Sequence, residues 1–82
     1  MNIEEKVKEI VSRICEIDTI EVNNNSSIGR YPQWDSVGHL AILSEVEEAF
    51  NINFEAEDMM EIEKVDDIIV MVKKILKNNQ ST

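Results

Sequence analysis

The sequence is poor in the residues that cross-link or interrupt a backbone. Its 82 residues include one cysteine, one proline and two glycines. A lone cysteine excludes an internal disulfide and a zinc cluster built from cysteines, so we interpret Cys15 as a packed thiol. The scarcity of proline and glycine favours long regular segments.

Positive charge is also scarce. Eight lysines and arginines stand against 17 aspartates and glutamates, which gives a formal net charge of -9. This balance argues against binding to nucleic acid or to an anionic membrane and favours partners with basic surfaces. The sequence has no apolar run of membrane-spanning length and no secretory signal. We therefore expect a cytoplasmic monomer without membrane insertion.

What the chain does contain is apolar residues at helical spacing. They make up 43% of the sequence, enough for a single domain over residues 1–82, near the lower limit for a self-sufficient core. Steps of three and four residues predict an all-α fold, a small bundle of three main helices plus one short helix. The predicted helices are Asn2 (as N-cap) to about Ile17, Ser36 to about Phe50, Glu57 to about Glu63, and Val65 to about Lys77, followed by a frayed Asn78–Thr82. The positions expected to be buried on these stripes include Ile42, Val46, Phe50 and Ile69.

A long polar loop, Asp18–Gln33, separates the first and second predicted helices. Loops of this length in small domains are usually functional or disordered. Four apolar or aromatic side chains are available to pin it to the core, namely Ile20, Val22, Ile28 and Tyr31. Further along, Met59 and Met60 are adaptable fillers, for which we favour core packing over the lining of a cleft.

The junction Trp34–Leu40 carries the candidate chemistry. An Asp or Ser just before an apolar helical run is the usual N-cap, because its side-chain oxygen accepts from the free N–H groups of the first turn. The positive end of a helix also suits a phosphate, so a hydroxyl held there, that of Ser36, could carry a phosphodiester. Taken alone, Asp35-Ser36 is more often only a cap.

Two other kinds of site fit less well. Ser36 and His39 are three residues apart and could meet on one helical face beside Asp35, as in a hydrolase. However, the sequence has no Gly-x-Ser-x-Gly turn, and Asp35 is placed to cap the helix rather than to orient the imidazole. We therefore predict no catalytic residue. We also predict no metal site, because His39 has no second ligand at a suitable spacing.

The residues around Ser36 resemble the modification site of acyl carrier proteins. The resemblance covers nearly the whole chain, at Asp35-Ser36-Val37, Leu40, Ile42, Leu43, Val46-Glu47-Glu48-Ala49-Phe50, Ile52, Phe54, Met60, Ile62 and Val65. It implies that Ser36, beside Asp35, holds a covalent 4′-phosphopantetheine arm that a phosphopantetheinyl transferase moves from coenzyme A. The arm would hold acyl groups as thioesters for partner enzymes, and the chain would be a carrier rather than an enzyme. It also implies that the apolar residue at Ile28 pins the loop.

Two alternatives to an acyl carrier stay open from the sequence. One is an aminoacyl or peptidyl carrier paired with an adenylating ligase. The other is an unmodified acidic helical module that only binds partners.

One face of the second predicted helix carries the residues expected to bind partners. There Val37 and Leu40 lie beside Glu47 and Glu48. Small apolar contacts supply affinity and charges supply steering, so the mixture suits a docking surface. The resemblance makes this the face for acyl-loading and acyl-transferring enzymes with basic docking surfaces.

Several positions depart from the common fatty-acid carriers. Gln33-Trp34 stands where they have Gly-Ala, Val37 where they have Leu, and Lys64 where they have a Ser or Thr cap. The run Gly38-His39-Leu40 is more similar to carriers of specialised pathways. We expect Trp34 to be half exposed and Lys64 to start its helix weakly. The sequence gives no reason for a glycine at position 38, where it carries a helix cost.

Overall fold

An asparagine cap starts the first helix. In the computed structural model, which describes residues 2–80, the Asn2 carboxamide oxygen accepts from the N–H of Glu5 at 3.1 Å. Helix α1 spans Ile3–Cys15 and ends before the predicted Ile17, because Glu16 takes a left-handed conformation with φ of 57°. The N–H of Ile17 then turns back to the carbonyl of Ser12 at 3.0 Å.

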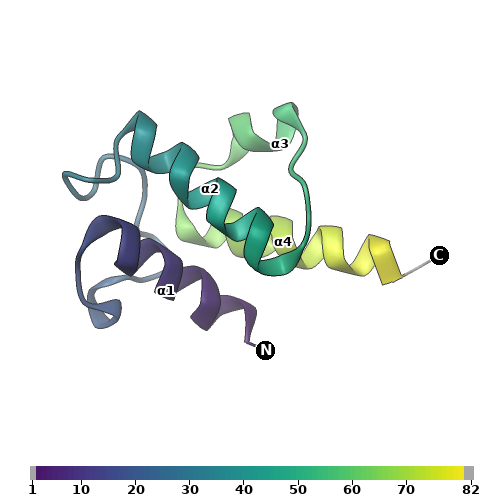
Figure 1. The fold of residues 1–82 in the computed structure, drawn as a ribbon, viewed down its shortest axis with the longest axis horizontal. Coiled ribbons are helices and arrows are strands. Elements are labelled where there is room, and N and C mark those ends of the chain that lie inside the picture. Colours follow the sequence, from purple (N-terminus) through teal and green to yellow (C-terminus); the bar gives the residue numbers. More distant parts are fainter. Residues whose placement is uncertain (1, 81–82) are drawn as a thin grey trace.

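The later elements complete an all-α bundle. They are the 3-10 turn η1 (Thr19–Glu21), α2 (Ser36–Phe50), α3 (Ala56–Glu61) and α4 (Val65–Gln80). Every regular element within residues 2–80 is helical, so the predicted fold class is confirmed. Helix α1 packs against both α2 and α4. The short helix α3 lies in the connection between α2 and α4, on the far side of α2 from α1 in Figure 1. No helix in this described part of the chain is both long and apolar enough to cross a membrane.

Two more helix ends differ from the prediction. Helix α4 continues to Gln80 instead of stopping at Lys77. The fraying predicted for residues 78–82 stays a prediction, and residues 81–82 lie outside the described part. Helix α3 ends at Glu61 instead of Glu63. The chain leaves that helix because Ile62 adopts an extended conformation and is buried in the core.

The core is formed by the apolar stripes of the three long helices and by the segments between them. Three of the four positions predicted on these stripes, Ile42, Val46 and Ile69, are buried. Phe50 is only partly buried, because it is the last residue of α2 and packs on the edge of the core. Cys15 is buried and free, as predicted, and burial raises the pKa of its thiol above the ordinary value.

Hydrogen bonds, more than apolar side chains, hold the long loop. Val22 is buried, but Ile20 and Ile28 are exposed, so the prediction that Ile28 pins the loop is wrong. The Tyr31 hydroxyl donates to the carbonyl of Glu21 at 3.0 Å. The hydroxyl of buried Ser26, 2.9 Å from that of Tyr31, therefore donates to Tyr31.

The same loop supplies the cap that Lys64 lacks. The N–H of Val65 donates to the carbonyl of Ser26 at 2.9 Å, and the N–H of Asp66 donates to the carbonyl of Asn24 at 3.0 Å. These bonds satisfy donors that a helix start otherwise leaves open. Helix α4 therefore begins at Val65, as predicted, without a Ser or Thr cap.

The two methionines of α3 do not behave alike. Met59 is partly buried and packs against the core, whereas Met60 is 83% exposed. Core packing is therefore the wrong expectation for Met60.

Candidate functional site

Asp35 is the cap of α2, and Ser36 is the first residue of the helix proper. The Asp35 carboxylate accepts from the N–H of Gly38 at 2.8 Å, and the Asp35 carbonyl accepts from the N–H of His39 at 2.8 Å. Because Asp35 does the capping, the hydroxyl of Ser36 is not needed for that task. The Ser36 side chain is exposed. The first turn of α2, to which it belongs, directly follows the long loop (Figure 1).

The surroundings of Ser36 fit a covalently attached phosphodiester. Its hydroxyl is open to a large donor molecule because the side chain is exposed. The aligned peptide dipoles of α2 place partial positive charge at this end of the helix, which offsets the charge of a phosphate. The residues present therefore suit a 4′-phosphopantetheine arm attached through phosphate to Ser36.

Trp34 is fully buried, so the prediction of a half-exposed side chain is wrong. Its indole folds back onto the first turn of α2, where Nε1–H donates to Nδ1 of His39 at 2.9 Å. The two rings are stacked at 22° with centroids 6.2 Å apart, and Tyr31 lies on the tryptophan at 6.5 Å. A contact between the residue before a helix cap and the fourth helical residue fixes the angle at which the chain enters the helix.

The closeness of the incoming chain explains the glycine at position 38. A Cβ on Gly38 would lie 1.9 Å from the carbonyl oxygen of Gln33 and 3.4 Å from a carboxylate oxygen of Asp35. The first of these contacts is with backbone, which has no rotamer by which to move away. Only glycine therefore lets Gln33–Asp35 lie so close to the first turn of α2.

Replacing Gly38 by alanine should lower the free energy of unfolding by about 2 kcal/mol or more. The forced contact with Gln33 outweighs the gain of about 1 kcal/mol that alanine brings as a better helix former. Urea denaturation measures the difference. Ser44→Ala, at an exposed position of the same helix, is the control and should leave stability unchanged or slightly raised. Equal stability of the two variants would contradict the close approach of Gln33.

The hydrolase arrangement does not form. Nδ1 of His39 accepts from Trp34, and the Asp35 carboxylate accepts from Gly38, so neither is directed to activating Ser36. In residues 2–80, no group of three or more histidine, cysteine, aspartate or glutamate residues is arranged to hold a metal ion.

The predicted docking residues separate into two kinds. Val37 is 76% exposed, Leu40 is 62% exposed, and Glu48 is exposed. Glu47 is only partly exposed, and its carboxylate accepts from the N–H of Phe54 at 2.7 Å. The carboxylate of Glu47 therefore anchors the chain that leaves α2, whereas that of Glu48 is exposed.

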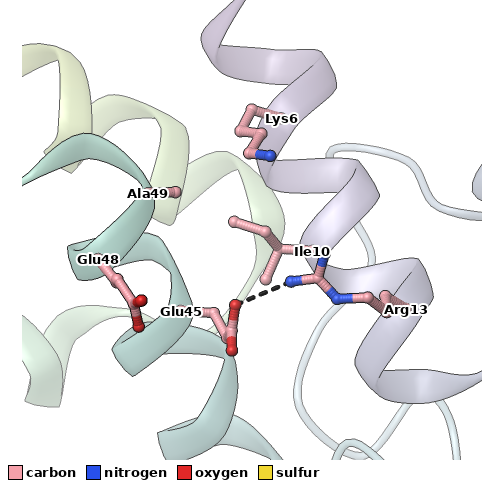
Figure 2. Close-up of a pocket in the computed structure, with 6 residues that line it drawn as sticks. All are labelled: Lys6, Ile10, Arg13, Glu45, Glu48 and Ala49. Atoms are coloured by element: carbon pink, nitrogen blue, oxygen red, sulfur yellow. Dashed lines mark hydrogen bonds and ion pairs between the residues drawn. The ribbon is translucent and has the colours of Figure 1, made fainter.

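Glu48 also borders a shallow polar groove between α1 and α2. Figure 2 shows Arg13 of α1 reaching across it to Glu45 of α2, where the guanidinium and a carboxylate oxygen are 2.8 Å apart. Lys6 and Ile10 line the α1 side. The groove follows the later turns of α2, away from Ser36 at its first turn, so it is not part of the candidate site.

Two hydrogen bonds of the site were not predicted from the sequence. The pairing of Trp34 with His39 had a signal in the sequence, namely the spacing between the residue before a cap and the fourth helical residue. The bond from Phe54 to Glu47 had no such signal, because it depends on how the chain turns after α2.

The chain is similar to known proteins in both sequence and fold. A family model described as a phosphopantetheine attachment site matches residues 5–72. The chain is 32% identical over 73 residues to an acyl carrier protein of Chlamydia caviae, covering 89% of this chain and 95% of that one. It is 32% identical over 74 residues to an acyl carrier protein of Solidesulfovibrio magneticus, covering 90% and 95%.

A solved structure shares the fold. It is the solution structure of a holo acyl carrier protein from Geobacter metallireducens, with a TM-score of 0.82 over 98% of this chain and 92% of that chain. The two sequences are 21% identical, so this likeness concerns the fold alone.

Proposed function

We propose that this chain, which belongs to the acyl carrier protein family, carries its 4′-phosphopantetheine arm on the hydroxyl of Ser36. Members of this family are carriers and not catalysts. The observation that supports the attachment point is the exposure of Ser36 at the first position of α2, directly after a separate capping residue, Asp35.

The chain's own residues present the hydroxyl but do not activate it. The two candidate bases on the same turn, Asp35 and His39, are engaged with Gly38 and Trp34. We therefore expect the transferase to supply the base that takes up the proton of Ser36. When attached, the arm supplies a terminal thiol that forms thioesters with acyl groups.

The direct test of this function is the intact mass of the chain after incubation with coenzyme A and a broad-specificity phosphopantetheinyl transferase. We expect the wild-type chain to gain the mass of one phosphopantetheine. A chain that stays unmodified under conditions that load another carrier protein would overturn the proposal and favour an acidic module that only binds partners.

The family implies interaction with a phosphopantetheinyl transferase and with acyl-handling enzymes. We propose that these partners dock on the exposed face of α2 at Val37, Leu40 and Glu48. A partner that reaches Ser36 must cover the first two turns of α2, where Val37 and Leu40 offer apolar contacts. Glu48 lies farther along the helix and is suited to steering basic residues at the rim.

The variant Glu48→Lys should be modified about threefold more slowly at low ionic strength, and its rate should depend less on salt, because rim charges mainly change association. Folding should be nearly unchanged, since Glu48 is exposed. The measurement is the modification rate across a salt series. Glu4→Lys, at an exposed position of α1, makes the same change of charge away from Ser36 and is the control. Identical rates and salt slopes for the two variants would contradict docking at Glu48.

A further inference from the structure

We propose that Trp34 and His39 are positioning residues, and that the hydrogen bond between them sets the rate at which Ser36 is modified. This inference rests on the proposed function of Ser36. Trp34 precedes Ser36 by two residues and His39 follows it by three, so the bond of 2.9 Å from Nε1–H to Nδ1 closes the chain around the serine.

Ser36 depends on its neighbours for its position. Its own side chain is exposed, and that of Val37 is 76% exposed, so neither is held by packing in the core. Trp34, in contrast, is fully buried. The position of Ser36 is therefore set by buried Trp34, which precedes it, and by helix α2, which follows it.

The backbone of Trp34 is fixed as firmly as its side chain. Its carbonyl accepts from the N–H of Gly29 at 2.7 Å, and its N–H donates to the carbonyl of Tyr31 at 2.9 Å. The backbone of Trp34 is therefore bonded to the long loop, while its indole is bonded to α2 through Nδ1 of His39. Ser36 lies between these two fixed points, and the glycine at position 38 lets them approach.

The bond also fixes the tautomer of the neutral imidazole. An indole N–H can only donate, so Nδ1 of His39 must offer its lone pair, and in the neutral ring the proton is on Nε2. No other side chain on this turn has a nitrogen that could accept from the indole N–H. A side chain at position 39 without an acceptor leaves the buried indole N–H unsatisfied and frees the loop from α2.

Three substitutions separate the hydrogen bond from simple packing. Trp34→Phe removes the donor and keeps an aromatic ring, and His39→Leu removes the acceptor at similar size. His39→Asn restores an acceptor close to the position of Nδ1. Val72→Ala, in the buried stripe of α4, is the control for a general loss of stability, because it removes core volume on another helix and leaves the donor of Trp34 and the acceptor of His39 in place. The assay is the steady-state modification of each full-length chain by one transferase with coenzyme A.

We expect kcat to fall on the order of tenfold in Trp34→Phe and in His39→Leu, because a small misplacement of a reacting group costs this much or more. KM should change little, since Val37, Leu40 and Glu48 are unaltered. His39→Asn should recover most of the loss, and the double variant Trp34→Phe with His39→Leu should be no slower than either single variant.

The spectroscopic signature of the bond is independent of the rate. Trp34 is the only tryptophan, so a single indole N–H signal reports on it in NMR spectra. That signal should have a hydrogen-bonded shift in the wild type and in His39→Asn but not in His39→Leu. The neutral ring of His39 should be protonated on Nε2 in the wild type.

The outcomes separate this inference from the proposed function. A wild-type chain that is not modified contradicts both. A modified wild type beside variants with unchanged kcat contradicts the positioning role alone. So does a loss confined to KM, an equal loss in Val72→Ala, or a failure of His39→Asn to recover.

Discussion

The variant Ser36→Ala should fold like the wild type and take up no phosphopantetheine. The loss is complete because the arm needs a hydroxyl oxygen at this position. The stability should change by less than about 0.5 kcal/mol, as for other exposed substitutions. If Ser36 were the cap, the change would cost about 0.5–2 kcal/mol, but Asp35 holds that role. Intact mass after treatment with transferase and a urea melt measure the two effects.

The control for this variant is Ser44→Ala. Among the serines in the described residues, Ser12 and Ser26 are buried, Ser27 is partly buried, and Ser36 and Ser44 are exposed. Exposure alone therefore leaves Ser44 as the competing position on α2. Full modification of Ser44→Ala with none of Ser36→Ala is the expected pattern, and a mass gain in Ser36→Ala would contradict the attachment point.

The variant Leu43→Ala should lower the free energy of unfolding by about 2–5 kcal/mol, the range for large-to-small changes in a core. Leu43 is 1% exposed and belongs to the buried core of the bundle. A loss of this size is a large share of the stability of a small domain. Urea denaturation of purified chains provides the measurement.

Leu40→Ala is the matched control, because it makes the same chemical change on the same helix. Leu40 is 62% exposed, so its loss should cost less than about 0.5 kcal/mol. It should instead slow modification, since Leu40 belongs to the proposed docking face. Similar stability losses in Leu40→Ala and Leu43→Ala would mean that the two faces of α2 are assigned wrongly.

Periodicity predicted the helices well, because burial of one face is a property of local spacing. The stripe through Ile42 and Val46 is buried, and Val65 begins α4 as expected. Ends that depend on backbone conformation were less accurate. Helix α1 ends where the backbone of Glu16 adopts a left-handed conformation, which the sequence does not predict.

Contacts made by the connecting segments accounted for three features that the sequence did not predict. Ile28 is an apolar residue in a loop, yet its backbone N–H, bonded to the carbonyl of Glu63, does the holding while its side chain is exposed. In the sequence Glu47 does not differ from other surface acids, but in the structure its carboxylate accepts from the N–H of Phe54. The glycine at position 38 had no explanation from helix propensity, because its reason lies in the approach of Gln33.

The most direct test of attachment to Ser36 is to locate the modification in the wild-type chain. Trypsin cleaves after lysine and arginine, so Arg30 and Lys64 bound one peptide, residues 31–64, in which Ser36 and Ser44 are the serines. Fragmentation of the loaded peptide in a mass spectrometer then assigns the arm to one of them. We expect all of the added mass on Ser36, and an arm on Ser44 or on a serine outside this peptide would contradict the proposed attachment point.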